Sequence, residues 1–308
     1  MYVSTARVAH MYYELGMTQQ NIANEVNVSR IQVSRMLQQA RTEGVVKISI
    51  DYGGYYPELE EGLAKRYEVV SFVVGDSVDG SDSAIKRSVG VTCAQYLAQH
   101  LKTGATVAVG WGTTLREVGE AFTTDARELT FVPVVGGQVG AGLDVHANSI
   151  AELCARNSGG TALRMFAPAV AESKKARDVL AASLSVKQTL KAAAGAQTIV
   201  FSVGSPFGDY TTINKVGYFS EEEFANLKAS GAACDLISIA YFDSNGKRCG
   251  AELSDRAVSI SLDQLSAIPN KICAAGGPDK HQAIAIALDL GLIDVLVTDD
   301  VTARFLLG

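Results

Sequence analysis

The sequence of 308 residues contains no apolar run of the roughly 18 to 20 residues that a membrane-spanning helix needs. Its first ten residues, MYVSTARVAH, lack the apolar core of a signal peptide. Its five cysteines are far apart and odd in number, and no C-x-x-C pair occurs, so the sequence suggests neither a disulfide framework nor a zinc site. We therefore expect a cytoplasmic protein, and we assign it no metal and no cofactor.

An excess of positive charge is also absent, because the net charge is −6. The charge is unevenly distributed: the first 51 residues carry +1, so the remaining 257 carry −7. This asymmetry has the sign expected of an N-terminal segment that binds DNA. A charge of +1 would hold DNA weakly, since neutralisation of phosphates supplies much of the affinity. We therefore expect at least two copies of the chain to bind DNA together.

Two helices joined by a short turn are predicted near the N-terminus. Thr18 is a suitable N-cap for a helix over 19–26, and Ser29 for a longer helix over 30–43. The run VVKISI over 45–50 predicts a strand or β-wing. Together with a preceding helix over 4–15, the pattern predicts a helix-turn-helix, whose second helix fits the major groove of DNA.

The helix over 30–43 has one apolar and one polar face. Its apolar stripe contains Met36, Leu37 and Ala40, with either Ile31 or Val33. Arg can bond a guanine edge at two atoms and Gln an adenine edge, each worth roughly 1–3 kcal/mol of discrimination. The alternative is a three-helix bundle, or a protein-binding winged helix, with an ordinary solvated face. The outward polar residues are Arg30, Gln32, Ser34, Arg35 and Gln38.

After a glycine-rich hinge over 51–56, predicted strands alternate with predicted helices. This alternation favours an α/β fold with a mostly parallel sheet and helices on both faces. We expect two domains, a DNA-binding domain over 1–51 and an effector-binding and oligomerisation domain over 52–308. Strands are expected over 69–74, 105–110, 131–135, 163–167, 198–203, 236–242, 271–275 and 295–299.

Ligands of such sheets bind beyond the carboxyl ends of the strands. The turn Gly110-Trp111-Gly112-Thr113-Thr114 offers amides and hydroxyls at a helix N-terminus, which suits an anion, although short turns often contain Gly and Thr for geometry alone. The remaining candidates for effector contacts are weaker, because each can be explained without a ligand, as part of a tight turn, an N-cap, a solvated lysine or the start of a strand. These weaker candidates are Gly136, Gly137, Gln138, Asn148, Lys215 and Asp235.

The strongest group of candidates lies near the C-terminus. Lys280 falls in the first turn of a predicted helix, where a cation opposes the helix dipole, and a bound anion would explain that position. Asp299 and Asp300 end the following strand and can hold sugar hydroxyls. The alternative is a surface lysine and an acidic N-cap. His146 has no partner at metal-ligand spacing, so we predict no metal role for it.

Several stretches resemble the SorC/DeoR-type sugar-binding transcriptional regulators. The pattern G-x-T-Q-x-x-I-A-x-x-x-x-V-S-R-x-x-V-S-R-x-L covers the first helices. VGWGTTL (109–115), VPVVGG (132–137) and AAGGPDKHQAIAIAL with GLIDVLVTDDVTARFLL (274–307) cover much of the remainder. The resemblance implies a Rossmann-like effector domain similar to glucosamine-6-phosphate deaminase and ribose-5-phosphate isomerase. It also implies operator DNA, a sugar, polyol or sugar-phosphate effector, and a homotetramer.

The same resemblance implies roles for individual residues. This sequence departs from the family pattern at two positions: Asp300 stands where a Glu is frequent, and Thr113 stands where a basic residue is frequent. A non-phosphorylated polyol or pentose therefore remains an alternative effector. With candidates from the residue patterns added, the expected DNA contacts are Thr18, Gln19, Ser29, Arg30, Gln32, Val33, Ser34, Arg35 and Gln38. The expected effector contacts are Gly112, Thr113, Thr114, Gly136, Gly137, Gln138, Asn148, Lys215, Asp235, Lys280, Asp299 and Asp300.

These observations predict a DNA-binding regulator of a carbohydrate-utilisation operon, controlled by an effector in the larger domain, and not an enzyme. The alternative is a sugar-phosphate isomerase or deaminase with an accessory DNA-binding head, in which Lys280 and the two aspartates supply acid–base or Schiff-base chemistry. None of the four histidines falls in an obvious catalytic loop. A DNA-binding protein with a ligand-free body is a third option.

Overall fold

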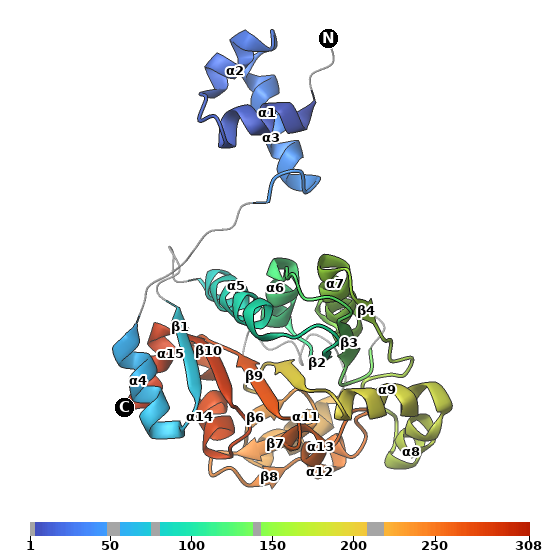
Figure 1. Cartoon of the computed structure of the whole chain (residues 1–308). Coiled ribbons are helices and arrows are strands. Elements are labelled where there is room, and N and C mark those ends of the chain that lie inside the picture. Colours follow the sequence, from blue (N-terminus) through green and yellow to red (C-terminus); the bar gives the residue numbers. More distant parts are fainter. Residues whose placement is uncertain (1–3, 48–55, 75–80, 138–142, 208–218) are drawn as a thin grey trace. The chain divides into compact units, whose positions relative to one another are not determined.

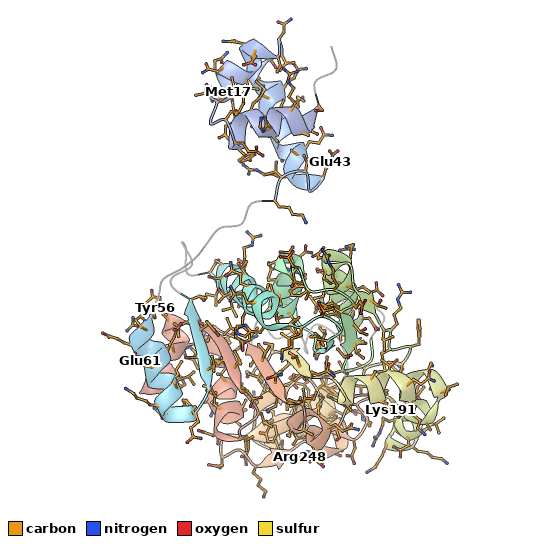
Figure 2. All side chains as sticks on the ribbon, viewed as in Figure 1. Met17, Glu43, Tyr56, Glu61, Lys191 and Arg248 are labelled. Atoms are coloured by element: carbon orange, nitrogen blue, oxygen red, sulfur yellow. The ribbon has the colours of Figure 1, made fainter. Side chains whose placement is uncertain are left out.

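The computed structural model describes residues 4–47, 56–74, 81–137, 143–207 and 219–308 (Figure 1). The chain divides into two compact units, Met1–Asp51 and Tyr52–Gly308. Figure 2 shows side chains filling the interior of each unit, whereas charged side chains such as Lys191 and Arg248 lie on the surface of the larger one.

The small unit consists of helices α1 (Thr5–Tyr13), α2 (Gln19–Glu25) and α3 (Arg30–Thr42). The predicted caps are confirmed, because the hydroxyls of Thr18 and Ser29 accept the backbone N–H groups of Asn21 and Gln32. The apolar faces of the helices meet in one core. Its fully or nearly fully buried side chains are Val8, Ala9, Met11, Ile22, Ala23, Val33, Leu37 and Ala40.

Two expectations for the small unit are resolved. Val33 is 0% exposed and Ile31 is 68% exposed, so Val33 belongs to the apolar stripe of α3. The predicted strand over 45–50 is not found in residues 45–47, of which 45 and 46 form a bend, and residues 48–50 lie outside the described residues.

The larger unit contains a seven-stranded sheet within its described residues, and the neighbouring strands of this sheet are all parallel. This confirms the predicted α/β class. The strands are short and nearly continuous runs of buried residues, as expected of a sheet covered on both faces. In spatial order they are β1 (Val70–Val74), β10 (Val295–Asp299), β9 (Asn270–Ala274), β5 (Thr198–Phe201), β2 (Thr106–Val109), β3 (Thr130–Pro133) and β4 (Thr161–Ala162).

Alternation along the strands separates two apolar cores. Val107 and Val109 face one core, while Ala108 between them faces the other. Helices α5 (Asp82–His100), α6 (Thr113–Ala121) and α7 (Ala147–Ser158) cover the first face (Figure 1). The helices against the opposite face are α4 (Pro57–Tyr67), α9 (Leu184–Ala194), α14 (His281–Asp289) and α15 (Asp300–Leu307).

A second, antiparallel sheet packs on that opposite face and is formed by β6 (Ala232–Leu236), β7 (Ala240–Asp243) and β8 (Arg248–Cys249). The prediction of one strand over 236–242 is therefore wrong. The chain reverses at Ile237 and Ser238, whose φ angles are +45° and +61°. No Gly or Asn marks this turn, although those residues normally occupy such backbone conformations.

The remaining elements connect the layers. They are η1 (Leu143–Val145), α8 (Lys174–Ala182), α11 (Glu221–Ala229), α12 (Ala251–Ser254), α13 (Leu262–Ser266) and η2 (Pro278–Lys280). The strand expected over 163–167 is also wrong, because the edge strand ends at Ala162. Beyond it, the N–H and C=O of Met165 bond to the side-chain amide of Asn148, at 2.8 and 3.1 Å, instead of to a neighbouring strand.

Candidate functional site

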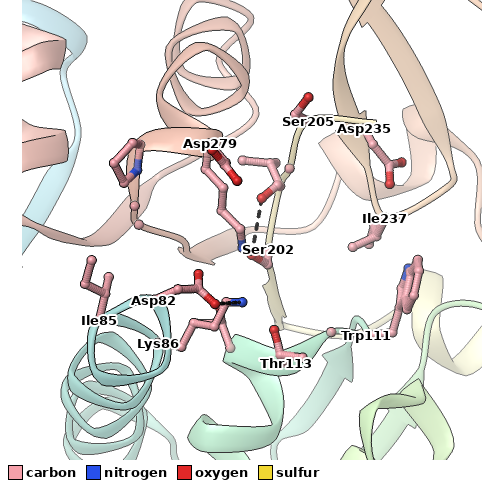
Figure 3. A pocket seen from close by; sticks show the side chains of 18 residues that line it. Asp82, Ile85, Lys86, Trp111, Thr113, Ser202, Ser205, Asp235, Ile237 and Asp279 are labelled. Atoms are coloured by element: carbon pink, nitrogen blue, oxygen red, sulfur yellow. Dashed lines mark hydrogen bonds and ion pairs between the residues drawn. The ribbon is translucent and has the colours of Figure 1, made fainter. Parts of the chain in front are cut away.

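A cavity of about 240 Å³ opens beyond the carboxyl ends of β2, β5 and β9. Three turns that follow these strands line it, at residues 111–114, 202–205 and 276–280. The start of α5 and the β6–β7 turn complete the wall, so that segments far apart in the chain meet here (Figure 3). This is the edge at which ligands of open α/β sheets bind.

Two lysines contribute to the cavity in different electrostatic states. Lys86 forms an ion pair with Asp82, one turn earlier on α5. The ammonium of Lys280 donates a hydrogen bond to the Ser202 hydroxyl at 3.0 Å, and within the described residues it forms no ion pair. Burial, with a smaller contribution from Lys86, lowers the pKa of Lys280 to about 8. At neutral pH Lys280 is therefore mostly protonated and has no ion-pair partner in the part of the chain that the structure describes.

Asp235 stands at the opposite wall and is 8% exposed. One carboxylate oxygen accepts the N–H of Ser238 at 2.7 Å, and the backbone of Asp235 exchanges two hydrogen bonds with Gly204. Burial raises the pKa of Asp235 to about 7, although the Ser238 hydrogen bond and Lys280 oppose that rise. A carboxyl group with this pKa can either donate to or accept from a ligand hydroxyl near neutral pH.

The start of α6 offers unsatisfied polar groups to the same cavity. Its N-cap is Gly112, at a φ of +127°, and no side chain caps the helix. The hydroxyl of Thr114 is buried and has no hydrogen-bond partner among the described residues. Since buried polar groups are nearly always paired, this hydroxyl is a candidate to bind a ligand. Of the sequence-predicted effector residues, Gly112, Thr113, Thr114, Asp235 and Lys280 line the cavity.

Gly136, Gly137 and Asn148 do not line this cavity, so the expectation for them needs correction. A Cβ atom on Gly136 would lie 2.4 Å from the carbonyl oxygen of Pro168, which shows that glycine permits close backbone packing there. The side chain of Asn148 is occupied by both backbone groups of Met165. These residues shape the structure beside the site and do not form its wall.

Asp299 and Asp300 are also absent from the wall. The Asp299 side chain is buried, caps α15 through the N–H of Thr302 at 2.9 Å, and accepts the N–H of Gly277 at 2.7 Å. It therefore fixes the turn that carries Lys280. Asp300 pairs with Arg304 on α15, at 3.6 Å. The N-cap alternative thus describes Asp299 better than the sugar-binding one. Gln138 and Lys215 lie outside the described residues.

Several lining residues were not singled out as effector contacts from the sequence, among them Asp82, Lys86, Trp111 and Ile237. Trp111 lies inside the stretch VGWGTTL and is the single tryptophan of the chain, which was an available signal. Asp82 and Lys86 are spaced as an i,i+4 pair, but that spacing alone indicates only an exposed helix face. The turn residue Ile237 carried no recognisable signal.

On the small unit, the polar face of α3 is exposed at Arg30, Ser34, Arg35 and Gln38. The expectation for Val33 is wrong, since its side chain is buried in the helix core. Gln32 has a second role, because its side-chain oxygen accepts the N–H of Ser29 at 3.1 Å in a capping box. A contact to a base through both polar atoms of its side-chain amide would have to share the oxygen with that bond. Thr18 and Ser29 act as N-caps, and Gln19 is half-buried.

Residues 56–308 match the family model described as "Putative sugar-binding domain". The chain belongs to the SorC/DeoR-type family of sugar-binding transcriptional regulators. It is 30% identical to Transcriptional regulator LsrR of Enterobacter sp. (strain 638), over 98% of this chain and 92% of that protein. It is 28% identical to the Deoxyribonucleoside regulator of Bacillus subtilis (strain 168), over 97% and 96% of the two chains.

A solved structure extends the likeness to the whole chain. The full-length sorbitol operon regulator SorC of Klebsiella pneumoniae aligns with a TM-score of 0.75 and 25% identity, over 99% of this regulator and 98% of SorC. The chain is a transcriptional regulator with a sugar-binding domain. No helix in the described ranges is both long and apolar enough to span a membrane. Within those ranges, no three His, Cys, Asp or Glu residues form a metal-binding group.

Proposed function

We propose that this regulator binds operator DNA through its small unit, and that a small carbohydrate bound in the cavity of the larger unit controls that binding. The observation that carries the proposal is the cavity at the strand ends, whose wall contains an ammonium without an ion pair and a hydroxyl without a hydrogen-bond partner among the described residues. Because the chain belongs to a family of sugar-binding regulators, we assign a carbohydrate to this cavity.

We assign the anionic part of the effector to Lys280, Thr114 and the first amides of α6. Lys86 is already paired with Asp82, so Lys280 is the lysine of the cavity that remains to face an anion, with Asp235 and Asp279 also in the lining. A helix N-terminus and an ammonium together favour a phosphate group. We therefore favour a sugar phosphate over a neutral polyol or pentose, which would leave the Lys280 charge unpaired in the cavity.

The sugar portion would contact the remaining walls. Trp111 presents a large apolar side chain, and Ile85 and Ile237 add apolar surface. Asp235 can hold a sugar hydroxyl, and its fixed position beside Gly204 would orient that hydroxyl. Apolar walls with a few placed polar groups are the usual form of small-molecule sites.

We propose a sensor and not an enzyme. The pKa values near 7 for Asp235 and near 8 for Lys280 would suit acid–base chemistry on a sugar. The same two groups suffice to bind a phosphorylated sugar, and the relatives compared are named as regulators. Product formation from a bound sugar phosphate would be the contrary result.

Control of DNA binding requires that the effector favour one arrangement of subunits. We propose a homo-oligomer, with a tetramer implied by the family, that acts in the cytoplasm. Paired heads must lie about 34 Å apart, or a multiple of that distance, to reach successive major-groove faces. A coupling free energy of about 1–3 kcal/mol would change operator affinity roughly 5–150-fold.

The proposal is tested by calorimetric titration of the full-length regulator with pentoses, hexoses, polyols and their phosphates. We expect a sugar phosphate to bind, and we expect Lys280→Met to weaken its binding at least tenfold while leaving operator affinity unchanged. Lys175→Met, at an exposed lysine of α8, is the matched control. Equal affinity of the Lys280→Met variant and the unmodified protein for each ligand would remove Lys280 from the site. Consumption of the ligand without any effect on DNA binding would support the enzyme alternative.

A further inference from the structure

The exposed face of α3 carries one large apolar side chain among its polar residues, that of Ile31. Ile31 is the second residue of α3 and is 68% exposed. In the described part of the small unit, the other exposed large apolar side chains are Tyr13, Leu15 and Val45, and Ile31 is the most exposed of the four. A single exposed apolar residue is ordinary on a protein surface. Its position on the helix is what distinguishes it.

Ile31, Arg35 and Gln38 are spaced at i, i+4 and i+7, so they lie on one face of α3. Val33 and Leu37 lie on the opposite face and are buried in the small unit. Neither Arg30 nor Arg35 forms an ion pair within the described part of the chain, so this exposed face is cationic. The apolar side chain therefore lies in the first turn of a cationic helix face.

The capping box removes a competing side chain from that first turn. Gln32 folds back so that its side-chain oxygen accepts the N–H of Ser29 at 3.1 Å, and the Ser29 hydroxyl accepts the N–H of Gln32. The Ile31 side chain has no polar atom that could form such a bond, and it is 68% exposed. In helix-turn-helix proteins, N-terminal residues of the second helix contact base edges.

We propose that Ile31 recognises a thymine in the operator, by packing against its 5-methyl group in the major groove. This inference rests on the proposed binding of DNA by α3. Among the four bases only thymine presents a methyl group in that groove, so an apolar side chain there selects for it. The neighbouring arginines supply contacts to phosphates or guanines, which by themselves would not select thymine.

A second copy of the chain is the other possible occupant of this surface. Charge argues against it, because a symmetric contact through Ile31 would bring Arg35 of one copy towards Arg35 of the other. DNA supplies the opposite charge and the apolar methyl at the same surface. The proposal therefore commits to the duplex.

The test pairs a change in the protein with a change in the DNA. Operator sequences are first selected from random duplexes with the full-length regulator, and each thymine is then replaced by uracil, which lacks the methyl group and keeps the pairing. The unmodified regulator should lose about fourfold in affinity at one thymine per half-site, since one buried methyl group is worth about 0.8 kcal/mol. Ile31→Ala should lose most of the difference between the thymine and uracil duplexes at that position, because its shorter side chain buries less of the methyl group.

Val45→Ala is the matched control, because Val45 is also exposed and apolar but lies after the end of α3. It should keep the full loss at uracil. Ile31→Ala removes only exposed surface, so the variant should fold, and circular dichroism checks this.

The inference is overturned if the unmodified regulator tolerates uracil at every position, or if Ile31→Ala shows the same profile as the unmodified protein. A change in oligomeric state of Ile31→Ala without DNA, together with an unchanged uracil profile, would assign Ile31 to a subunit contact instead. Failure of the unmodified regulator to select any sequence would refute DNA binding itself, and the inference with it.

Discussion

Replacing Asp235 by Asn should stabilise the larger unit at pH 8 and leave its stability at pH 4 nearly unchanged. Burial raises the pKa of Asp235 to about 7 from its ordinary value of 3.8, while the carboxyl forms no ion pair within the described residues. The folded protein therefore holds a proton that the unfolded chain releases between about pH 4 and pH 7. Its free energy of unfolding should fall as the pH rises through that window and then level off.

The magnitude follows from the shift in pKa. About 3 pKa units at about 1.4 kcal/mol each set an upper limit of roughly 4 kcal/mol on the cost of ionising Asp235 in the folded state. Asparagine retains an oxygen that can accept the N–H of Ser238, and it cannot ionise. Asp235→Asn should therefore exceed the unmodified protein in stability at pH 8 by up to that amount.

Urea unfolding at several pH values, followed by circular dichroism, measures the difference between the two proteins. Asp125→Asn, at an exposed carboxyl group, is the control, and its difference in stability from the unmodified protein should depend little on pH. A stability difference that is the same at pH 4 and pH 8 would refute the reasoning. So would a lower stability of Asp235→Asn at pH 8, because the carboxylate would then be stabilising.

Three further predictions concern other residues. Affinity for a sugar phosphate, measured by calorimetry, should fall as the pH rises through about 8, because Lys280 loses its proton there. The Lys280→Met variant should lose that dependence on pH. If this variant keeps the pH profile of the unmodified protein, a role for the Lys280 charge is excluded. Gly136→Ala should destabilise the larger unit by about 2 kcal/mol or more in urea unfolding, since the added Cβ overlaps the backbone of Pro168, and a neutral effect would contradict the packing. In thermal unfolding, Val33→Ala should lower the free energy of unfolding by roughly 2 kcal/mol, whereas Ile31→Ala should change it by no more than about 0.5 kcal/mol. Equal losses of stability in the two variants would show that α3 is rotated from the described orientation.

Much of the fold follows from local patterns. The hydroxyls of Thr18 and Ser29 cap their helices as expected, because an N-cap depends on a few neighbouring backbone groups. Strand β10 matches its predicted bounds, since an apolar run with a following acidic residue is a strong local signal. Predictions of this kind need no knowledge of distant parts of the chain.

The β6–β7 turn shows where local patterns fail. Ile237 and Ser238 adopt positive φ angles that neither residue favours, and only the surrounding contacts hold them. Among these contacts is the hydrogen bond from the Ser238 N–H to Asp235. The apolar stretch 236–242 therefore resembled one strand, although tertiary contacts fold it into two.

The site was predictable in part for the same reason. Gly112, Thr114 and Lys280 belong to turns after strands, and a parallel sheet brings such turns to one edge whatever the details of packing. Asp299 belongs to the same edge, but the backbone N–H groups of Gly277 and Thr302 occupy its carboxylate. Which side chains remain available to a ligand depends on these individual hydrogen bonds, and the sequence does not display them.

The most direct test of the account is to measure operator affinity of the full-length regulator with and without a sugar phosphate that calorimetry has shown to bind. The account predicts a change of roughly 5–150-fold, with an equal reciprocal change in effector affinity when operator is present. Tight binding of the sugar phosphate that leaves operator affinity unaltered would contradict it.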